Sequence, residues 1–518
     1  AALNKEKKSR LSEINLRKSE LANEFSQNLI DATNEYELIV CEDDVDGMSE
    51  NEKQSAAFDD NGETKYKFTL QMPSYIAYMT YGKNSEIREK LYKAYTTRSP
   101  QNALIIDELL ALRQEMAQLL GFENYAQYSL ASKMAKDSSE VVEFLEHLAL
   151  SSYSQAKNEL EELLNFHNIE KINSFDSAYY SEILKKRSYD IDEELYRPYF
   201  EQQNVVNGMF TFLEKLFGIK FVKTDESYYD EKVTSYDLHV DDTLRARLYL
   251  DLDARKGKRG GAWMHNHQTH CIDENGEEIL ASAFVVCNFP SSLKSASLLR
   301  HDDVVTLFHE MGHAIHHLLS RVNENSVSGV NGVEWDAVEF PSQFLENFAY
   351  EKSVLKMFAL HVDSHEVISD EMCDKLIKVK NFQSALGMLR QLEFSLFDFK
   401  LHEKLYSADE VQNLLDGIRE KTALIKPPSY NKFQNGFSHI FAGGYAAGYY
   451  SYKYAEVLSA DMFFKVVDEA IFGSDVAKKY LDVVLSNGGA YSMSKLFIDI
   501  MGKKPDVSSL LRLNGIES

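Results

Sequence analysis

The sequence predicts a mainly helical protein with one small β-sheet. In residues 4–35, apolar side chains recur at helical spacing, at Leu11, Ile14, Leu21, Phe25 and Leu29. The 518 residues include only eight prolines, and proline is the residue that most strongly interrupts helices. Strand-like patterns cluster in three segments, 233–240, 245–252 and 279–287. After residue 300 the pattern is almost wholly helical.

The expected elements follow from the apolar spacing and from residues that begin or end helices. Asp137, with Glu140 three residues later, is typical of a helix start. Gly121 and Gly218 each follow an apolar run and are typical of helix ends. We therefore expect helices at 4–35, 85–97, 102–120, 137–168 and 201–217, and short strands at 36–41 and 66–70.

Composition excludes several classes of partner. The chain is 44% hydrophobic and 26% charged, as in soluble globular proteins. Its net charge of −25 argues against nucleic acid or an anionic membrane as a partner. It lacks any stretch of about 18 apolar residues that would span a membrane. The lysine-rich first ten residues have no apolar core, so they are no signal peptide. Four scattered cysteines form no disulfide framework. We expect a cytoplasmic protein, with a processed organellar form as the alternative.

The most informative motif is His309-Glu310-Met311-Gly312-His313, which reads H-E-x-x-H within a helical pattern. Residues four apart lie on one face of a helix, so the two imidazoles can hold one metal ion. Zinc suits this ligand set and leaves a position for water. Glu310 lies beside the metal, where a carboxylate can accept a proton from the attacking water. The alternative is an ordinary amphipathic helix with a polar side.

A catalytic zinc site needs a third protein ligand, and two residues are candidates. His316 lies seven residues after His309, two turns along the helix. Glu339 begins a second helical stretch. The loop between the motif helix and this stretch is rich in turn formers, so the second stretch can fold back on the first. We choose Glu339 and expect His316 to pack beside the site. Glu346, seven residues beyond Glu339, either holds a ligand imidazole by its other nitrogen or is an ordinary helix carboxylate.

These motifs, taken with their surroundings, resemble the thimet-oligopeptidase family of zinc peptidases, especially its bacterial oligopeptidase A branch. The similar segments are 249–252, 257–264, 309–313, 335–347 and 438–452. Met311 departs from the family, which usually has an aromatic residue there. The chain also begins at Ala1, where family members would already be past their first helices. We therefore expect an N-terminal helical segment to be trimmed or missing.

The resemblance implies a zincin-like core with a small sheet, and helical walls around a deep channel that admits short peptides. We divide the chain into a mostly helical wall region, 1–190, and a catalytic region, 191–518, interleaved in space. Matched to the family's glycine- and tyrosine-rich loop, His439, Tyr445 and Tyr452 would stabilise the oxyanion. Tyr449 of the same loop is a candidate substrate contact. Gly260, Gly261 and Ala262 are candidates for pairing with the substrate backbone, since their loop lacks the order of a phosphate-binding motif.

Two weaker clusters have ordinary interpretations. His265, His267, His270 and Cys271 have the residue types of a second metal site, but histidines at an exposed hairpin are usually only solvated. The acidic run at 42–46 lacks the EF-hand spacing and is typical of a solvated turn.

The sequence thus favours a monomeric zinc endopeptidase that cleaves short peptides, with one Zn²⁺ per chain. The alternative is a zinc-containing protein that binds peptides without cleaving them. An intact Glu310 beside both histidines argues against that alternative, because a pure binding protein needs no base.

Overall fold

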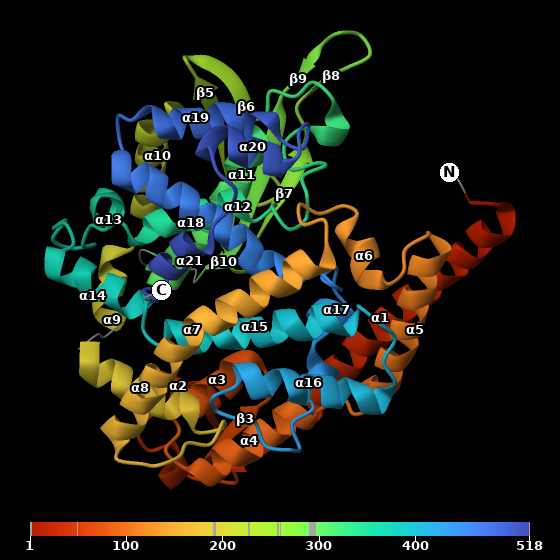
Figure 1. The fold of residues 1–518 in the computed structure, drawn as a ribbon. Helices are drawn as coiled ribbons and strands as arrows, with labels where there is room; N and C mark the ends of the chain where they lie inside the picture. The colour runs from red at the N-terminus through yellow and green to blue at the C-terminus, as the bar shows by residue number, and fades with distance from the viewer. Residues whose placement is uncertain are drawn as a thin grey trace.

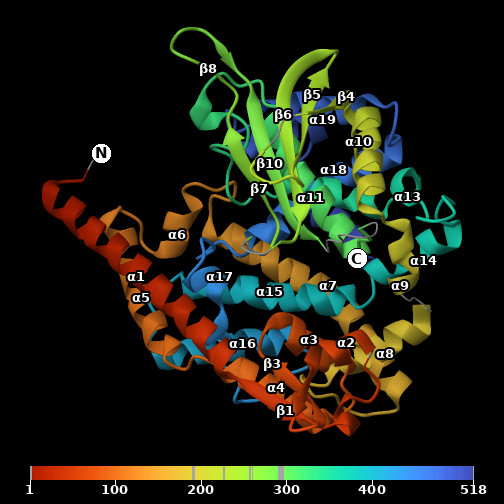
Figure 2. The same cartoon turned by 180° about the vertical axis from the view of Figure 1, so that it is seen from behind.

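A computed structural model describes residues 3–48, 50–189, 193–225, 228–255, 258, 261–289 and 297–516. Helices dominate the chain, as predicted, and a five-stranded sheet from the middle of the chain lies in the upper part of the molecule, with one side open in Figure 2 (Figures 1 and 2). In Figure 1 the sheet and α10, α11, α18 and α19 form the upper part of the molecule, above a lower part that is mostly helical.

The main sheet has the strand order β4-β5-β6-β10-β7. Its strands are β4 Ile219–Thr224, β5 Thr234–Val240, β6 Thr243–Asp253, β7 Trp263–Gln268 and β10 Ala281–Phe289. The pair β6 and β10 is parallel, and the other pairs are antiparallel. The three predicted strands are confirmed as β5, β6 and β10. The strands β4 and β7 were not predicted, because both are edge strands with exposed polar residues.

The predicted helices of the first 220 residues are confirmed within one or two residues at their ends. They are α1 Lys5–Glu35, α4 Ser85–Thr97, α5 Asn102–Leu119, α7 Ser138–His167 and α10 Gln202–Phe217. The side chain of Asp137 accepts a hydrogen bond from the N–H of Ser139 and so caps α7. Gly218 ends α10 in the left-handed conformation, at φ 72°.

The expectation of a single sheet is wrong. Strands β1 Glu37–Val40, β2 Ala57–Asp60 and β3 Glu63–Thr69 form a second, three-stranded sheet in the order β1-β3-β2. Asn61 and Gly62 join β2 to β3, and both have positive φ, 58° and 91°. An Asn-Gly pair in this conformation makes the tight turn that suits the twist of a hairpin. The short strands β8 Cys271–Ile272 and β9 Glu278–Ile279 form a further pair.

The remaining helices follow mostly after residue 300. They are α2 Glu50–Ala56, α3 Met72–Tyr81, α6 Tyr125–Leu130, α8 Ser177–Tyr189, α9 Glu193–Tyr196, α11 His301–Leu318, α12 Phe340–Glu346, α13 Lys352–Phe358, α14 Asp370–Lys380, α15 Ser384–Leu401, α16 Ala408–Thr422, α17 Ser438–Phe441, α18 Ser451–Glu469, α19 Asp475–Val483, α20 Met493–Met501 and α21 Val507–Leu513. Among the described residues, none of these helices has the length and apolar character needed to cross a membrane.

Segments far apart in the sequence share one core. Helix α15 lies along α7, and α17 lies beside α1 and α5 (Figures 1 and 2). A continuous cluster of buried side chains includes Leu21, Leu148, Leu389 and Phe441. Such contacts agree with the predicted interleaving of the two regions, which stays a prediction. The boundary between 190 and 191 stays a prediction, and both residues lie outside the described part of the chain.

Candidate active site

Helix α11 is the platform of the site because it is buried between the main sheet and the C-terminal helices. Its first turn carries Asp302 and Asp303, and the Asp303 carboxylate accepts a hydrogen bond from the N–H of Arg300, 2.9 Å away. His309 and His313 share one face of the helix, with ring centroids 5.0 Å apart. Met311 is fully buried on the other side. Its departure from the family pattern is therefore a matter of packing.

Helix α12 approaches α11 closely because of Gly312 in the motif. A Cβ atom at Gly312 would lie 2.5 Å from the carbonyl oxygen of Pro341 and 2.5 Å from the Cα of Ser342. Glu339 precedes the first turn of α12, at the point nearest the two histidines. The role of Gly312 was not predicted, because only the packing of the two helices shows that this position must lack a side chain.

Three side chains converge where these two helices meet. The carboxylate of Glu339 lies 3.3 Å from Nε2 of His309 and 3.1 Å from Nε2 of His313. Among the described residues these three form the one group whose donor atoms, all within 4.8 Å of one another, suit a metal ion. Two imidazoles and a carboxylate are the ligands of a catalytic zinc, so the residues present fit that ion.

The pKa values in this cluster are shifted because side chains of opposite charge lie next to one another. Burial alone would lower the pKa of His309, but its hydrogen bonds to Glu339 and Glu346 raise it to about 10. Burial alone would raise the pKa of Glu339, but the two histidines hold it well below its usual range. Both pKa shifts have the same cause, the mutual attraction of the imidazoles and the Glu339 carboxylate.

Glu346 and Glu310 lie on either side of this cluster. Glu346 accepts a hydrogen bond from Nδ1 of His309 over 3.0 Å, which fixes the ring with Nε2 toward Glu339. Glu310 is 7% exposed, and burial raises the pKa of its carboxyl while the two nearby histidines oppose that shift. The N–H of Met264 in β7 also contacts this carboxyl. Glu310 thus places a buried carboxyl group with a raised pKa beside the cluster.

Residues 438–452, here called the tyrosine loop, bring further donors to the cluster. The rings of Tyr445 and Tyr452 stack at 5.0 Å, and the charge of Glu339 is among the causes that raise the pKa of both, after burial. His439 is exposed, with its ring 6.2 Å from that of Tyr445. The hydroxyl of Tyr449 donates to Gln391, so this predicted substrate contact is directed into the protein.

A buried aspartate that the sequence analysis missed fixes the tyrosine loop. The carboxylate of Asp398 in α15 accepts hydrogen bonds from the N–H groups of Ala447, Gly448 and Tyr449, each over 2.9 Å. Ala447 has a positive φ of 49°, an uncommon conformation outside glycine. An aspartate in an apolar helix gives no sequence signal for this role, because its partners are 49 to 51 residues away.

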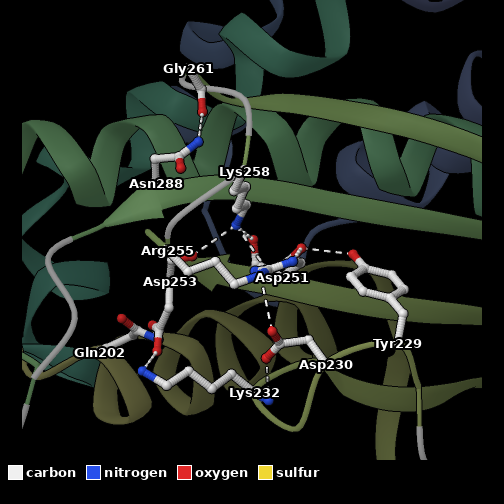
Figure 3. Close-up of polar contacts among 10 residues, drawn as sticks. All are labelled: Gln202, Tyr229, Asp230, Lys232, Asp251, Asp253, Arg255, Lys258, Gly261 and Asn288. Carbon is white, nitrogen blue, oxygen red and sulfur yellow. Dashed lines mark hydrogen bonds and ion pairs between the residues drawn. The ribbon is translucent and has the colours of Figure 1, made fainter. Parts of the chain in front are cut away.

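The loop between β6 and β7 is anchored by a second buried carboxylate, Asp251 (Figure 3). Arg255 and Lys258 both hydrogen-bond to it, and so does the hydroxyl of Tyr229. Burial would raise the pKa of Asp251, but these three donors lower it to about 2. The loop leads into β7, an edge strand of the main sheet.

The predicted backbone-binding residues lie at the end of that loop. The carbonyl of Gly261, whose φ is 97°, accepts a hydrogen bond from the Asn288 side chain over 2.7 Å (Figure 3). Ala262 packs against the core immediately before β7. Gly260 lies outside the described residues. The roles of Gly260, Gly261 and Ala262 stay predictions.

The structure does not bring together either alternative set of metal ligands, the one with His316 as third ligand or the one formed by His265, His267, His270 and Cys271. His316 is fully buried, burial lowers its pKa to about 3, and neither ring nitrogen has a hydrogen-bond partner among the described residues. It therefore packs in the core and gives no contact that would orient a ligand. In the second set, His267 contacts Ser282, and His270 contacts Glu278 and the carbonyl of Val322. Within the described chain these residues do not converge on one point.

The fold and the site together define a metallopeptidase. Over residues 78–516 the chain matches Peptidase family M3, and it belongs to this family. It is 41% identical over 540 residues to Oligopeptidase A of Salmonella typhimurium (strain LT2), a match that covers 99% of this chain and 79% of the relative. Identity and coverage are the same for Oligopeptidase A of Escherichia coli (strain K12). These matches confirm the resemblance inferred from the sequence.

Solved structures show the same fold at much lower identity. One described as PZ peptidase A with inhibitor 2 has a TM-score of 0.57 at 16% identity, covering 98% of this chain and 75% of that one. A putative oligoendopeptidase F has a TM-score of 0.58 at 16% identity, with the same coverage. The mainly helical fold with a small sheet is therefore shared beyond the range of close sequence similarity.

Proposed function

We propose that this oligopeptidase is a zinc-dependent endopeptidase that hydrolyses internal bonds of short peptides. The observation that carries the proposal is the convergence of His309, His313 and Glu339 beside Glu310. The three converging side chains would hold one zinc ion. When bound, zinc supplies a Lewis acid that polarises the attacking water and the peptide carbonyl.

The protein's own residues would handle the protons and the developing charge. Glu310 accepts the proton of the attacking water and delivers it to the leaving amine, a task that its raised pKa suits. Tyr445, Tyr452 and His439 donate hydrogen bonds to the oxygen of the peptide carbonyl as its negative charge develops. The open edge of β7, with Gly261 and Ala262 before it, pairs with the substrate backbone.

Peptide cleavage with and without a chelator tests this function. We expect purified protein to cleave an internally quenched peptide of about ten residues, to lose activity in 1,10-phenanthroline, and to regain it with about one equivalent of zinc. The alternative, a non-catalytic peptide-binding protein, predicts zinc-dependent binding of the peptide without cleavage. Mass spectrometry of the products locates the cleaved bond and separates internal from terminal cleavage.

We further propose that helical walls around the site restrict substrates to short peptides, and that the protein works as a monomer in the cytoplasm. The four cysteines are free, which supports a reducing compartment. An extended peptide needs about 3.3 Å per residue to pair with a strand, so a folded protein cannot enter. Peptides of increasing length, compared with denatured casein at equal bond concentration, test the size limit. Equal rates across the series would contradict an enclosing channel.

A further inference from the structure

A cavity behind the tyrosine loop contains two positive side chains and no negative one. It has a volume of about 370 Å³ and lies between α1, α5 and residues 441–446. Lys18 and Arg113 line it, together with Tyr125, Phe441, Gly443 and Gly444. None of its described lining residues is acidic. The charge of this cavity is thus opposite in sign to the net charge of the chain, which is −25.

The contact between α1 and α5 shows how this chain normally pairs its cations. Arg10 and Arg17 of α1 each reach a glutamate of α5 with two hydrogen bonds, Arg10 to Glu115 and Arg17 to Glu108. Lys18, the next residue, contacts the sulfur of Met116, 3.4 Å from its Nζ, and its Nζ lies 5.6 Å from the centroid of the Tyr125 ring. Burial and the charge of Arg113 lower the pKa of Lys18 to about 8. Among the described residues, no carboxylate forms an ion pair with Lys18, whose contacts are the Met116 sulfur and the Tyr125 ring.

Arg113 is also incompletely satisfied, although it is 5% exposed. It donates to Nε2 of His402 and to the carbonyl of Ile440, but its Nε has no partner among the described residues. Asp398, whose charge acts on Arg113, already accepts hydrogen bonds from three backbone N–H groups of the tyrosine loop. The buried Arg113 thus lacks a carboxylate of its own among the described residues, and a buried charge without a partner is costly.

We propose that this cavity binds a compact oxyanion, a carboxylate or phosphate group, between Lys18 and Arg113. Charge-assisted hydrogen bonds from an ammonium and a guanidinium are the contacts that such an anion prefers. The volume is at the small end of ligand pockets, which suits a small group and not a whole peptide. The group has two sources, a free anion in solution or the C-terminal carboxylate of a peptide. The second source rests on the proposed function.

The position of the cavity couples it to the tyrosine loop. Arg113 contacts His402, His402 lies 3.2 Å from Asp398, and Asp398 holds the loop by its backbone. Gly443, in the cavity wall, has no room for a side chain, because a Cβ would lie 2.7 Å from the carbonyl of His439. An anion at Arg113 therefore acts on the segment that carries His439 and Tyr445.

The direct test is anion-dependent thermal stability of the full chain. Acetate and inorganic phosphate are titrated with wild type, Lys18→Gln and Lys8→Gln. Lys8 is an exposed lysine of the same helix, about 15 Å away along its axis. We expect the Tm of wild type and Lys8→Gln to rise by about 2 °C near saturation, and that of Lys18→Gln to stay constant. Equal Tm shifts in all three proteins would overturn the site, whatever the enzymatic activity.

A second measurement distinguishes the two sources. One peptide is compared as free acid and as C-terminal amide. If the peptide supplies the carboxylate, wild type prefers the free acid by about 10-fold in kcat/KM, and Lys18→Gln loses that preference. If a free anion is the ligand, both forms are cleaved equally, and acetate changes the turnover of wild type but not of Lys18→Gln. If the peptide comparison shows neither effect and the Tm titration shows no difference among the three proteins, the proposal is refuted.

Discussion

The helix pair α11–α12 and the tyrosine loop meet at the same point, but different forces hold them. The helix pair is fixed by burial, by the close contact at Gly312 and by mutual attraction among His309, His313 and Glu339. The tyrosine loop has three glycines, and Asp398 holds its backbone through three N–H groups, while the hydroxyl of Tyr450 donates to a second buried carboxylate, Asp336. The loop therefore depends on hydrogen bonds to buried carboxylates in addition to packing, whereas the helix pair depends on the close contact of two helices.

This difference separates two kinds of residue around one site. Changes to the three converging side chains of the helix pair should alter metal content, because ligands must be held in place before any chemistry occurs. Changes in the tyrosine loop should alter turnover at constant metal content, since the donors that we propose for the reacting oxygen lie in this loop. The following predictions test that separation, from the largest expected effect to the smallest.

Glu339→Ala should remove both metal and activity. Zinc affinity should fall by more than the roughly 10- to 100-fold that losing a hydrogen-bond partner of a ligand costs. Zinc content after dialysis against a chelator is the measurement. His316→Leu is the control, because the unpaired ring of His316 makes no contact that an apolar side chain would lose. Loss of zinc in His316→Leu and its retention in Glu339→Ala would show that the third ligand is wrongly assigned.

Glu310→Gln should keep the metal and lose turnover. The amide has the shape of the carboxylate but accepts no proton, so kcat should fall on the order of 10³-fold. Zinc content and peptide cleavage are measured on the same preparation. One zinc per chain with activity within about tenfold of wild type would contradict the role of Glu310 as base.

Tyr445→Phe and Tyr452→Phe should each lower kcat by about 100-fold without changing zinc content. Each substitution removes one hydroxyl near Glu339 and leaves the ring in place. Tyr449→Phe is the matched control in the same loop, because its hydroxyl donates to Gln391 within the protein. If Tyr449→Phe lowers kcat as much as the other two substitutions do, the position of a hydroxyl in the loop does not decide its effect on turnover.

Asp398→Asn should affect stability more than chemistry. The amide cannot accept from three N–H groups as well as a carboxylate does, so the free energy of unfolding should fall by about 2 kcal/mol. Urea unfolding measures this, with Asp363→Asn, an exposed aspartate, as control. Zinc content should not change. A loss of zinc equal to that of Glu339→Ala would mean that the loop and the helix pair are one unit.

The sequence was informative wherever a function depends on residues close together along the chain. The H-E-x-x-H motif and the spacing to Glu339 and Glu346 predicted side chains that the structure brings together. The helix pattern was equally clear, because a buried face repeats every three to four residues. The Asn61-Gly62 hairpin also had a local signal, which the analysis overlooked.

The sequence by itself thus determined the helical class, the family and the side chains that converge at the candidate metal centre. Only the tertiary structure decided why position 312 lacks a side chain and which aspartate holds the tyrosine loop. It also brought Lys18 and Arg113 to one cavity, in which none of the described lining side chains is acidic. The physical reason is separation along the chain. Periodicity and motifs record contacts within one helix, whereas Gly312, Asp398 and Arg113 act on partners brought to them only by folding.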